Sequence, residues 1–336
     1  MALSDVVNTF GQWLLAKHGE RVHKIALDAG FTCPNRDGAK GIGGCTFCNN
    51  ASFSPNAPAG AGGDSAVPPP VLSQRRGRPA RPLEEQLDAG RAGIARRTRA
   101  RKYLAYFQAY TNTYADVQQL KALYDQALAV PGMIGLSVGT RPDCVPPAVL
   151  DLLANYRQEG LEVILELGLQ SAFDESLARV NRGHGLKEYE VTCRAARARG
   201  IPVCTHLILG LPGEDDRHYQ RSLDIVLDIG TDGLKLHPLH VVKGTQLANE
   251  WRRGEYTPLK LDDYVRAAVD LIERTPWDVV YHRLTGTAPA RLLLAPRWCA
   301  SKWPVVNAIV AELERRGSRQ GAAAASLREV SHACPA

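Results

Sequence analysis

The amino-acid sequence predicts an α/β fold, an incomplete TIM-like (β/α)6 barrel with an N-terminal helix and a short C-terminal α/β extension. Short apolar strands alternate with helices along most of the chain, which is the pattern of right-handed βαβ units and a parallel sheet. Six such repeats precede Leu239. The 336 residues, 45% of them hydrophobic and 23% charged, suit one large or two ordinary globular domains.

The predicted elements follow one another regularly. An amphipathic segment at 6–17 predicts a helix within the N-terminal region 1–21, and the first strand is predicted at 22–27. The other strands of the barrel are predicted at 103–109, 134–138, 161–167, 202–209 and 233–239. Helices are predicted from about Leu83 onward and at 115–130, 147–159, 186–199 and 215–229.

The predicted barrel spans residues 22–245 and carries an insertion at 56–82. The insertion is rich in Pro, Gly and Ala, so it cannot bury enough apolar surface to order itself, and we expect it to be flexible. A C-terminal extension or lid is predicted at 246–316, with helices at 261–273 and 305–315 and a strand at 279–283. Residues 317–336 are predicted to form a disordered tail.

Composition limits the compartment and the partners. No run approaches eighteen apolar residues, and the N-terminus lacks a basic region followed by an apolar core, so we expect neither a membrane span nor a secretory signal. Eight cysteines are then expected as reduced thiols in the cytoplasm. The formal charge is +6, and ten lysines and arginines against three acidic residues fall between Arg75 and Lys102. A basic stretch on a near-neutral body is a better nucleic-acid signal than a diffuse surplus.

One loop carries three of the cysteines. Cys33, Cys45 and Cys48 are spaced Cys-x11-Cys-x2-Cys, with four glycines and one proline between them. Glycine accepts a positive φ and proline blocks a helix, so this loop can wrap around a bound group. Three thiolates are one short of the four that close a structural zinc or iron–sulfur site. We therefore interpret the loop as a soft metal centre with one open position.

This loop, with the aromatic Phe47 before its third cysteine, resembles the signature of radical S-adenosylmethionine (SAM) enzymes. Its wide spacing is similar to the branch that contains the catalytic subunit of Elongator. The resemblance implies that Cys33, Cys45 and Cys48 hold a [4Fe–4S] cluster whose fourth iron takes the amino and carboxylate groups of SAM. It also implies cleavage of SAM to a 5′-deoxyadenosyl radical, with an external electron donor such as a flavodoxin or ferredoxin. The predicted barrel is the core fold of this family.

Ligands of βα barrels lie at the carboxyl ends of the strands, which makes the end of the fourth strand informative. It reads Glu166-Leu-Gly-Leu-Gln170, and Arg182 follows twelve residues after the glutamine. This segment resembles the Elongator branch, and the resemblance implies SAM contacts for Gln170 and Arg182. An amide can bind ribose hydroxyls, and a guanidinium can hold a carboxylate through two hydrogen bonds. Glu166 is expected to point into the barrel, where an unpaired carboxylate is costly, which favours a role beside SAM or the cluster.

Two further segments resemble SAM contacts of the family. Thr111, Asn112 and Thr113 follow the second strand, where the family places a segment that meets the SAM amino group; ordinary turn chemistry is the alternative. The fifth strand carries His206 and ends at Gly210, in a Gly-x-Pro-Gly-Glu sequence that looks like the adenine-flanking motif. For His206 the alternative is a satisfied core histidine.

The sixth strand supplies the candidates for catalysis. Lys235 and His237 alternate along it, so they share one face, and they line the substrate side if that face is the barrel interior. A later strand ends in His282-Arg283. Trp298 and Trp303 follow beside further basic residues, and this combination suits base stacking and a hydrophobic lid equally well.

Three functions remain open from the sequence. We favour a radical SAM enzyme that modifies an RNA, above all a tRNA base, because the related enzymes modify wobble uridine and because Arg75–Arg81 is expected at the barrel mouth. The second is a radical SAM enzyme that acts on a small metabolite or a peptide. The third is a non-catalytic iron–sulfur or zinc protein, which the set of SAM contacts disfavours. The chain after Thr245 is too short for the acetyltransferase domain of the Elongator subunit, so acyl transfer is not carried over.

Overall fold

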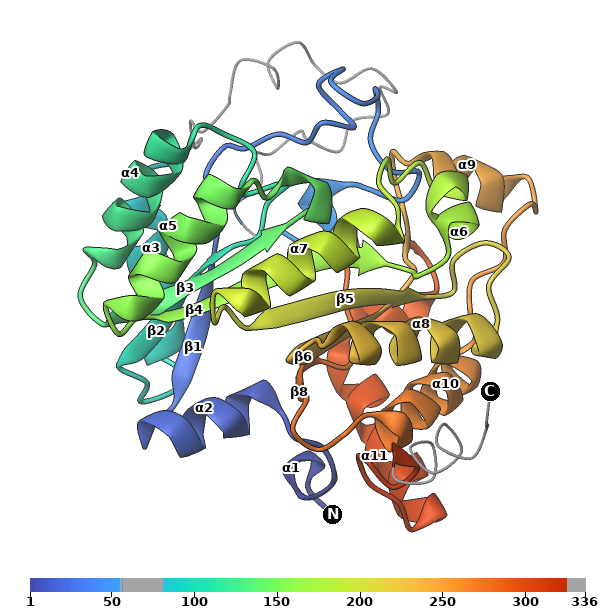
Figure 1. The fold of residues 1–336 in the computed structure, drawn as a ribbon. Helices are drawn as coiled ribbons and strands as arrows, with labels where there is room; N and C mark the ends of the chain where they lie inside the picture. The colour runs from blue at the N-terminus through green and yellow to red at the C-terminus, as the bar shows by residue number, and fades with distance from the viewer. Residues whose placement is uncertain (55, 57–80, 325–336) are drawn as a thin grey trace, which may run out of the picture.

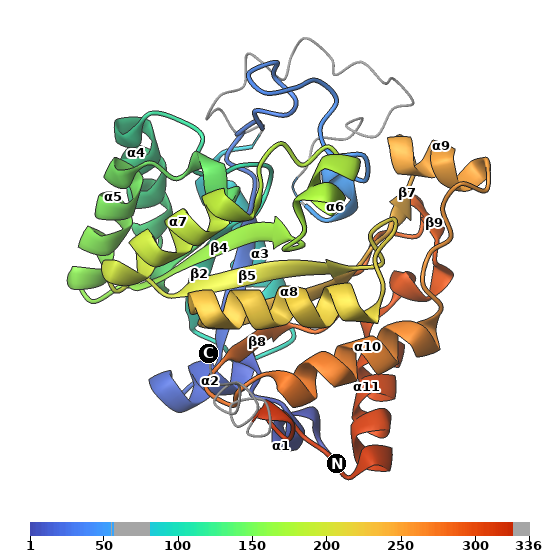
Figure 2. The same ribbon diagram turned by 45° about the vertical axis from the view of Figure 1, so that its right-hand side comes forward.

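The computed structural model describes residues 1–54, 56 and 81–324 and shows a curled parallel sheet with helices on its outer side (Figures 1 and 2). In the order in which they lie in the sheet, its strands are β1 (Val22–Leu27), β2 (Lys102–Phe107), β3 (Met133–Thr140), β4 (Glu162–Gln170), β5 (Val203–Leu209), β6 (Gly233–Pro238) and β8 (Val280–Arg283). Every neighbouring pair is parallel. This confirms the predicted incomplete barrel. It also adds a seventh strand, because the strand predicted in the C-terminal extension pairs with β6.

The helices that cover the sheet lie close to their predicted positions. They are α3 (Leu83–Ala95), α4 (Val117–Leu128), α5 (Pro147–Gln158), α7 (Leu186–Ala198), α8 (Asp216–Ile229) and α10 (Leu261–Arg274). Their ends follow local chemistry: the Asp215 carboxylate accepts hydrogen bonds from the N–H groups of Arg217 and His218, and Gly230 ends α8 in the left-handed conformation. None of the helices within the described ranges has the length and apolarity of a membrane span.

The remaining elements are short or flank the barrel. At the N-terminus lie α1 (Leu3–Val6) and α2 (Phe10–His18). The C-terminal region contains β7 (Val241–Val242), α9 (Gln246–Arg252), β9 (Leu293–Ala295) and α11 (Lys302–Arg316). The helix α6 (Asp174–Arg179) and three 3₁₀ turns, at Asn50–Ser52, Pro142–Cys144 and Arg297–Ala300, complete the described chain. The sequence did not predict α6, α9, β7 or β9, because segments this short carry little periodicity.

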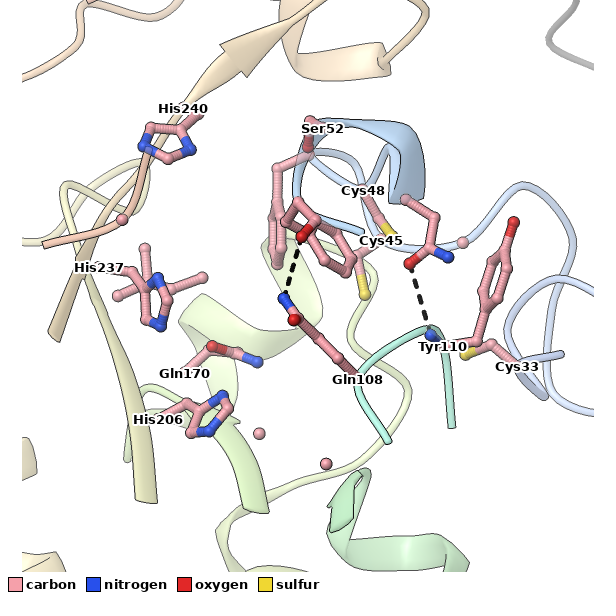
Figure 3. Close-up of a pocket in the computed structure, with 18 of the residues that line it drawn as sticks. Cys33, Cys45, Cys48, Ser52, Gln108, Tyr110, Gln170, His206, His237 and His240 are labelled. Atoms are coloured by element: carbon pink, nitrogen blue, oxygen red, sulfur yellow. Dashed lines mark hydrogen bonds between the residues drawn. The ribbon is translucent and has the colours of Figure 1, made fainter. Parts of the chain in front are cut away.

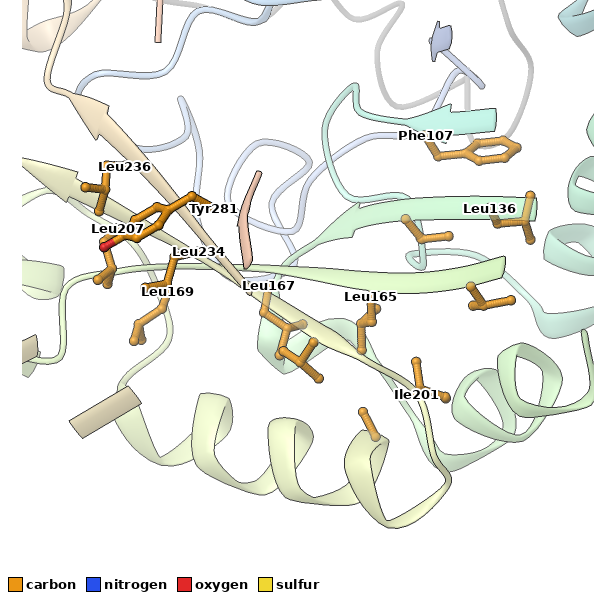
Figure 4. Packing of buried hydrophobic residues seen from close by; sticks show 14 of the residues in the cluster. Phe107, Leu136, Leu165, Leu167, Leu169, Ile201, Leu207, Leu234, Leu236 and Tyr281 are labelled. Carbon is orange, nitrogen blue, oxygen red and sulfur yellow. The ribbon is translucent and has the colours of Figure 1, made fainter. Parts of the chain in front are cut away.

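Outward-facing side chains of the strands build the hydrophobic core against the helices (Figure 4). Leu165, Leu167 and Leu169 alternate along β4 on this outer side, and each is fully buried. Leu207 on β5 and Leu234 on β6 continue the same layer. Burying a leucine side chain contributes about 1.5–3 kcal/mol, so this layer fixes the register of the sheet and thereby the positions that face inward.

Inward-facing side chains form successive layers within the barrel, because the side-chain period of a strand is two. At the amino ends of the strands, an apolar layer includes Val22, Leu104, Ile164, Cys204 and Val280, and Phe10 and Leu14 of α2 pack on it. Two residues further along each strand, the next inward-facing positions form a polar layer around Glu166. Beyond it, at the carboxyl ends, the barrel opens into a cavity.

Both ends of the chain depart from the prediction. The single N-terminal helix expected within 1–21 is divided into α1 and α2, because the intervening backbone pairs with β8: the Tyr281 N–H donates to the Asn8 carbonyl oxygen at 2.8 Å. The tail predicted as disordered from residue 317 is packed as far as 324. There Gln320 is buried and its backbone N–H donates to the Val6 carbonyl oxygen. Residues 325–336, and most of the insertion predicted at 56–82, lie outside the described residues.

Candidate active site

A cavity at the carboxyl ends of the strands brings together residues from the cysteine loop and from most strands (Figure 3). Its lining contains three cysteines, four arginines and three histidines. Among the described residues that line it there is no Asp or Glu. The cavity therefore has thiol chemistry together with an excess of positive charge.

The cysteine loop forms one side of the cavity. The Cys33 carbonyl oxygen accepts a hydrogen bond from the Arg36 N–H at 2.8 Å, which begins a tight turn. Gly43 and Gly44 adopt φ values of +89° and +86°, which an L side chain rarely adopts, and so bring the chain back to Cys45. All three cysteines of the loop are unpaired thiols, and Figure 3 shows their sulfur atoms on the same side of the cavity.

These thiols suit an iron–sulfur cluster better than a single ion. Within the described ranges, no three His, Cys, Asp or Glu side chains are arranged to hold one metal ion. In a [4Fe–4S] cluster each thiolate binds a different iron, so the ligands surround the cluster instead of converging on one point. Three thiols on one loop, facing a cavity free of lining carboxylates, fit this requirement. The assignment of Cys33, Cys45 and Cys48 as ligands stays a prediction.

Each of the three cysteines has an arginine beside it. The contacts are Arg141 Nη1 to Cys33 Sγ at 3.9 Å, Arg182 Nη1 to Cys45 Sγ at 3.6 Å, and Arg36 Nη1 to the Cys48 carbonyl oxygen at 3.4 Å. A guanidinium beside a thiolate offsets its negative charge. Three of the four arginines that line the cavity therefore have a partner in the cysteine loop.

Gln170 and Arg182, for which the resemblance implies SAM contacts, meet around Gly168 at the end of β4. Arg182 Nη2 donates to the Gly168 carbonyl oxygen at 2.6 Å, and a Cβ on Gly168 would approach Arg182 Nη2 and Gln170 Nε2 to 2.8 Å each. Gln170 has a left-handed φ of +83° where the register of β4 and β5 shifts, so its backbone is strained at this point. The buried Nε of Arg182 has no hydrogen-bond partner in the described part of the chain. Both side chains face the cavity with capacity for a ligand.

Glu166 points into the barrel, as expected, but its partners are side chains of the chain itself and it does not line the cavity. It is fully buried, and Lys24, Lys235, His206 and Ser137 all contact its two oxygens. Burial alone would raise the pKa of the Glu166 carboxyl, but the two ammonium groups hold it well below its usual value. The carboxylate stays charged, and the inward lysines of β1 and β6 satisfy it without a cofactor.

The other site residues predicted from the sequence divide into two groups. Thr111, His206 and His237 line the cavity, as expected. The second group does not line the cavity and consists of Asn112, Thr113, Gly210 and Lys235. Asn112 Nδ2 donates to the Gly139 carbonyl oxygen at 2.7 Å, Thr113 Oγ1 bonds the Cys144 carbonyl oxygen, and Gly210 bonds Tyr219 and Tyr256 through its backbone. The Lys235 ammonium lies below the cavity floor, bound to Glu166 and to Tyr106 Oη.

Sequence reasoning missed three residues that line the cavity, His240, Phe53 and Arg283. Figure 3 shows His237 and His240 opposite Cys33. The position of Arg283 at the end of a strand could have indicated a site residue. That strand was predicted to belong to the C-terminal extension, however, and not to the barrel sheet.

Sequence comparison defines the class of protein. Residues 33–226 match the radical SAM superfamily and residues 231–315 match the Radical_SAM C-terminal domain. The chain belongs to the radical SAM superfamily, whose enzymes use a [4Fe–4S] cluster and SAM. It is 48% identical to protein YhcC of Escherichia coli (strain K12) over 303 residues, which cover 90% of this chain and 91% of that protein. It is 38% identical to protein YtqA of Bacillus subtilis (strain 168) over 314 residues, 94% of this chain and 91% of that protein.

The Elongator likeness is shown over a shorter length. Elongator complex protein 3 of Schizosaccharomyces pombe is 32% identical over 155 residues, which cover 44% of this chain and 27% of that protein. Among solved structures, the archaeal Elp3 of Methanocaldococcus infernus has a TM-score of 0.64 at 16% identity. That match covers 89% of this chain and 64% of the archaeal chain, and it supports the fold alone.

Proposed function

We propose that this radical SAM enzyme modifies a base of an RNA, and that its substrate is a tRNA. The observation that carries the proposal is an exposed aromatic ring in the cavity lining, Phe53, together with two exposed cations near β7 and β9, next to the cavity residue Val242. The likeness to Elongator complex protein 3 over 155 residues supports the same choice. When bound, the cluster and SAM supply a 5′-deoxyadenosyl radical that abstracts a hydrogen atom from the substrate.

Phe53 is suited to stacking on an unpaired base. It lines the cavity, yet 40% of its surface is exposed, although most rings of this size in the protein are buried. Gln108 Nε2 donates to the Phe53 carbonyl oxygen at 3.1 Å and so fixes the backbone that carries the ring. Proteins that recognise single-stranded RNA stack splayed bases on such aromatic faces.

The cations lie on the rim formed by β7 and β9. These strands pair antiparallel, and the Lys243 N–H donates to the Leu292 carbonyl oxygen at 2.9 Å. The backbone of Lys243 therefore lies beside Leu292, the residue that follows Arg291. Both side chains are exposed, and neither forms an ion pair with any described residue. Val242, the neighbour of Lys243, lines the cavity. Unpaired cations beside a cavity mouth suit contacts to phosphates. Arg75, Arg76 and Arg78, expected at the same mouth, lie outside the described residues.

A salt titration of tRNA binding tests the proposal. The double variant Lys243→Gln, Arg291→Gln should bind tRNA more weakly, and its slope of log affinity against log salt should fall by about one unit for each phosphate group that no longer meets a cation. The matched control is Arg96→Gln, Arg99→Gln, because these exposed arginines precede β2 at the opposite end of the barrel. Equal weakening by both pairs would indicate unspecific charge attraction. A wild type that does not bind tRNA would refute the proposal and favour a small-molecule or peptide substrate.

A further inference from the structure

Arg283 is the one arginine of the cavity lining without a partner among the described residues. The other three contact the cysteine loop, and Arg141 also forms an ion pair with Asp143 at 2.9 Å. The Arg283 side chain forms no hydrogen bond or ion pair with any residue in the described ranges. It is half-buried in the cavity lining, so its N–H donors are open to a ligand that enters the cavity.

Position in the sheet explains why Arg283 points inward. It ends β8 and pairs with Lys235 of β6, whose side chain is inside the barrel. It lines the cavity together with His237, His240 and Gly286, which lie at or just beyond the carboxyl ends of β6 and β8. In Figure 3 His237 and His240 lie opposite Cys33.

The charges around Arg283 do not balance. Below the cavity floor, Glu166 is the single carboxylate of the described chain that pairs with Lys24 and Lys235, so this buried group carries one excess positive charge. Arg283 adds another. Arg283 is half-buried, so water reaches it, but an anion from outside the chain that binds beside it would relieve the repulsion among the cations gathered at this end of the barrel.

Two histidines beside Arg283 also have unused hydrogen-bonding capacity. The buried Nε2 atoms of His237 and His240 have no partner in the described chain. Burial and the charge of Arg283 lower the pKa of both rings, His240 to about 4, so the imidazoles are neutral near pH 7. Gly286 packs closely on them: a Cβ there would come within 2.7 Å of His237 Nδ1. The rings are therefore held in place as neutral hydrogen-bonding groups.

We propose that Arg283, with His237 and His240 beside it, binds an anionic group of the substrate, a carboxylate or a phosphate. A guanidinium binds either oxyanion through two parallel hydrogen bonds. The group would hold the target atom between the cysteine side of the cavity and β8. The inference deepens the proposed function by giving the charge of the bound group, yet its test does not require RNA.

The test uses full-length protein reconstituted anaerobically with its cluster and saturated with SAM. Binding of inorganic phosphate and of acetate is measured by calorimetry at constant ionic strength, with chloride as the balancing anion. The wild type should bind one of the two more tightly than chloride. Arg283→Gln should weaken that binding by about 10- to 100-fold, the range for loss of a charge-assisted hydrogen bond, and Arg283→Lys should retain part of it. Arg297→Gln, an exposed arginine with no ion pair in the described chain, is the control and should bind as the wild type does.

The possible outcomes distinguish a phosphate from a carboxylate as the bound anion, and they test the anion site separately from the proposed tRNA substrate. Tighter binding of phosphate indicates a nucleotide phosphate, and tighter binding of acetate indicates a carboxylate on the substrate. Equal binding by Arg283→Gln and wild type, or no binding by the wild type beyond chloride, overturns the inference. So does a tenfold loss of SAM affinity in Arg283→Gln with anion binding intact, because Arg283 would then serve SAM. If tRNA fails to bind but anion binding depends on Arg283, the RNA proposal is wrong and this inference stands.

Discussion

Replacing Glu166 by Gln should destabilise the fold strongly, because this carboxylate neutralises two lysines inside the barrel. Glu166 is fully buried and contacts the ammonium groups of Lys24 and Lys235. The substitution keeps the shape of the side chain and its ability to accept a hydrogen bond from Ser137, but it removes the negative charge. The two cations then remain buried without a counter-charge.

The size of the effect follows from these contacts. Removing one partner of a buried ion pair costs about 3–5 kcal/mol. The amide oxygen of Gln still accepts one hydrogen bond, which favours the lower end, about 3 kcal/mol at pH 6. Burial already lowers the pKa of Lys24 to about 8 despite the opposing attraction of Glu166, and loss of that attraction lowers it further. Below pH 8 the folded variant then binds fewer protons than the folded wild type, whereas the two unfolded chains bind nearly the same number. The free energy of unfolding of the variant therefore rises more steeply with pH, and its difference from that of the wild type should shrink from pH 6 to pH 8.

Urea unfolding of wild type and variant at pH 6 and pH 8 measures both the cost and its pH dependence. Glu162→Gln is the matched control, because Glu162 lies on the same strand but pairs with Lys17, whose side chain is 42% exposed. Glu162 is itself buried, but Lys17 reaches solvent and stays hydrated when its partner is removed, so this substitution should cost less than Glu166→Gln. Equal destabilisation by the two variants, or a Glu166→Gln cost that grows with pH, would contradict the reasoning.

Three further predictions concern the cluster, SAM and titration. Cys33→Ala should lose iron and sulfide after anaerobic reconstitution whereas Cys299→Ala, buried outside the cavity, should not; the reverse pattern would refute the ligand assignment. Gln170→Ala should bind SAM more weakly with normal iron content, because it removes a cavity-facing amide, and unchanged SAM affinity in calorimetry would show that the amide does not contact SAM. Lys24 has a folded pKa of about 8 against an ordinary value of 10.5, so the unfolded chain binds more protons between these values and stability must rise with pH there. Wild type should therefore gain stability relative to Lys24→Met from pH 8 to pH 10, and a constant difference would contradict the shift.

The strands of the barrel were predictable because their apolar residues are buried on the outer face and their spacing is regular. The first strand was predicted at its observed limits, 22–27, and the fifth within one residue. The break between α1 and α2 was not predictable, since it depends on a backbone contact between Asn8 and Tyr281 that are far apart in sequence. The same holds for Gln320, which is buried through hydrogen bonds to the distant Val6, Pro276 and Val279.

The candidate site was predictable where one segment supplies its residues. The three cysteines and the pair Gln170 and Arg182 each belong to one local pattern, and the structure brings both sets to the same cavity. The partners of Glu166 were not predictable, because they come from β1 and β6 and no local pattern reveals them. Arg283 was missed for the same reason, since its inward direction follows from the pairing of β8 with β6.

The central claim, a radical SAM enzyme that modifies RNA, is tested most directly by its two products in one reaction. Reduced, reconstituted enzyme is incubated with SAM and tRNA from cells that lack this protein. 5′-Deoxyadenosine is then quantified, and the RNA is digested to nucleosides for mass spectrometry. We expect that tRNA accelerates formation of 5′-deoxyadenosine and that one nucleoside changes in mass. An identical rate with and without tRNA, together with an unchanged nucleoside profile, would contradict the claim.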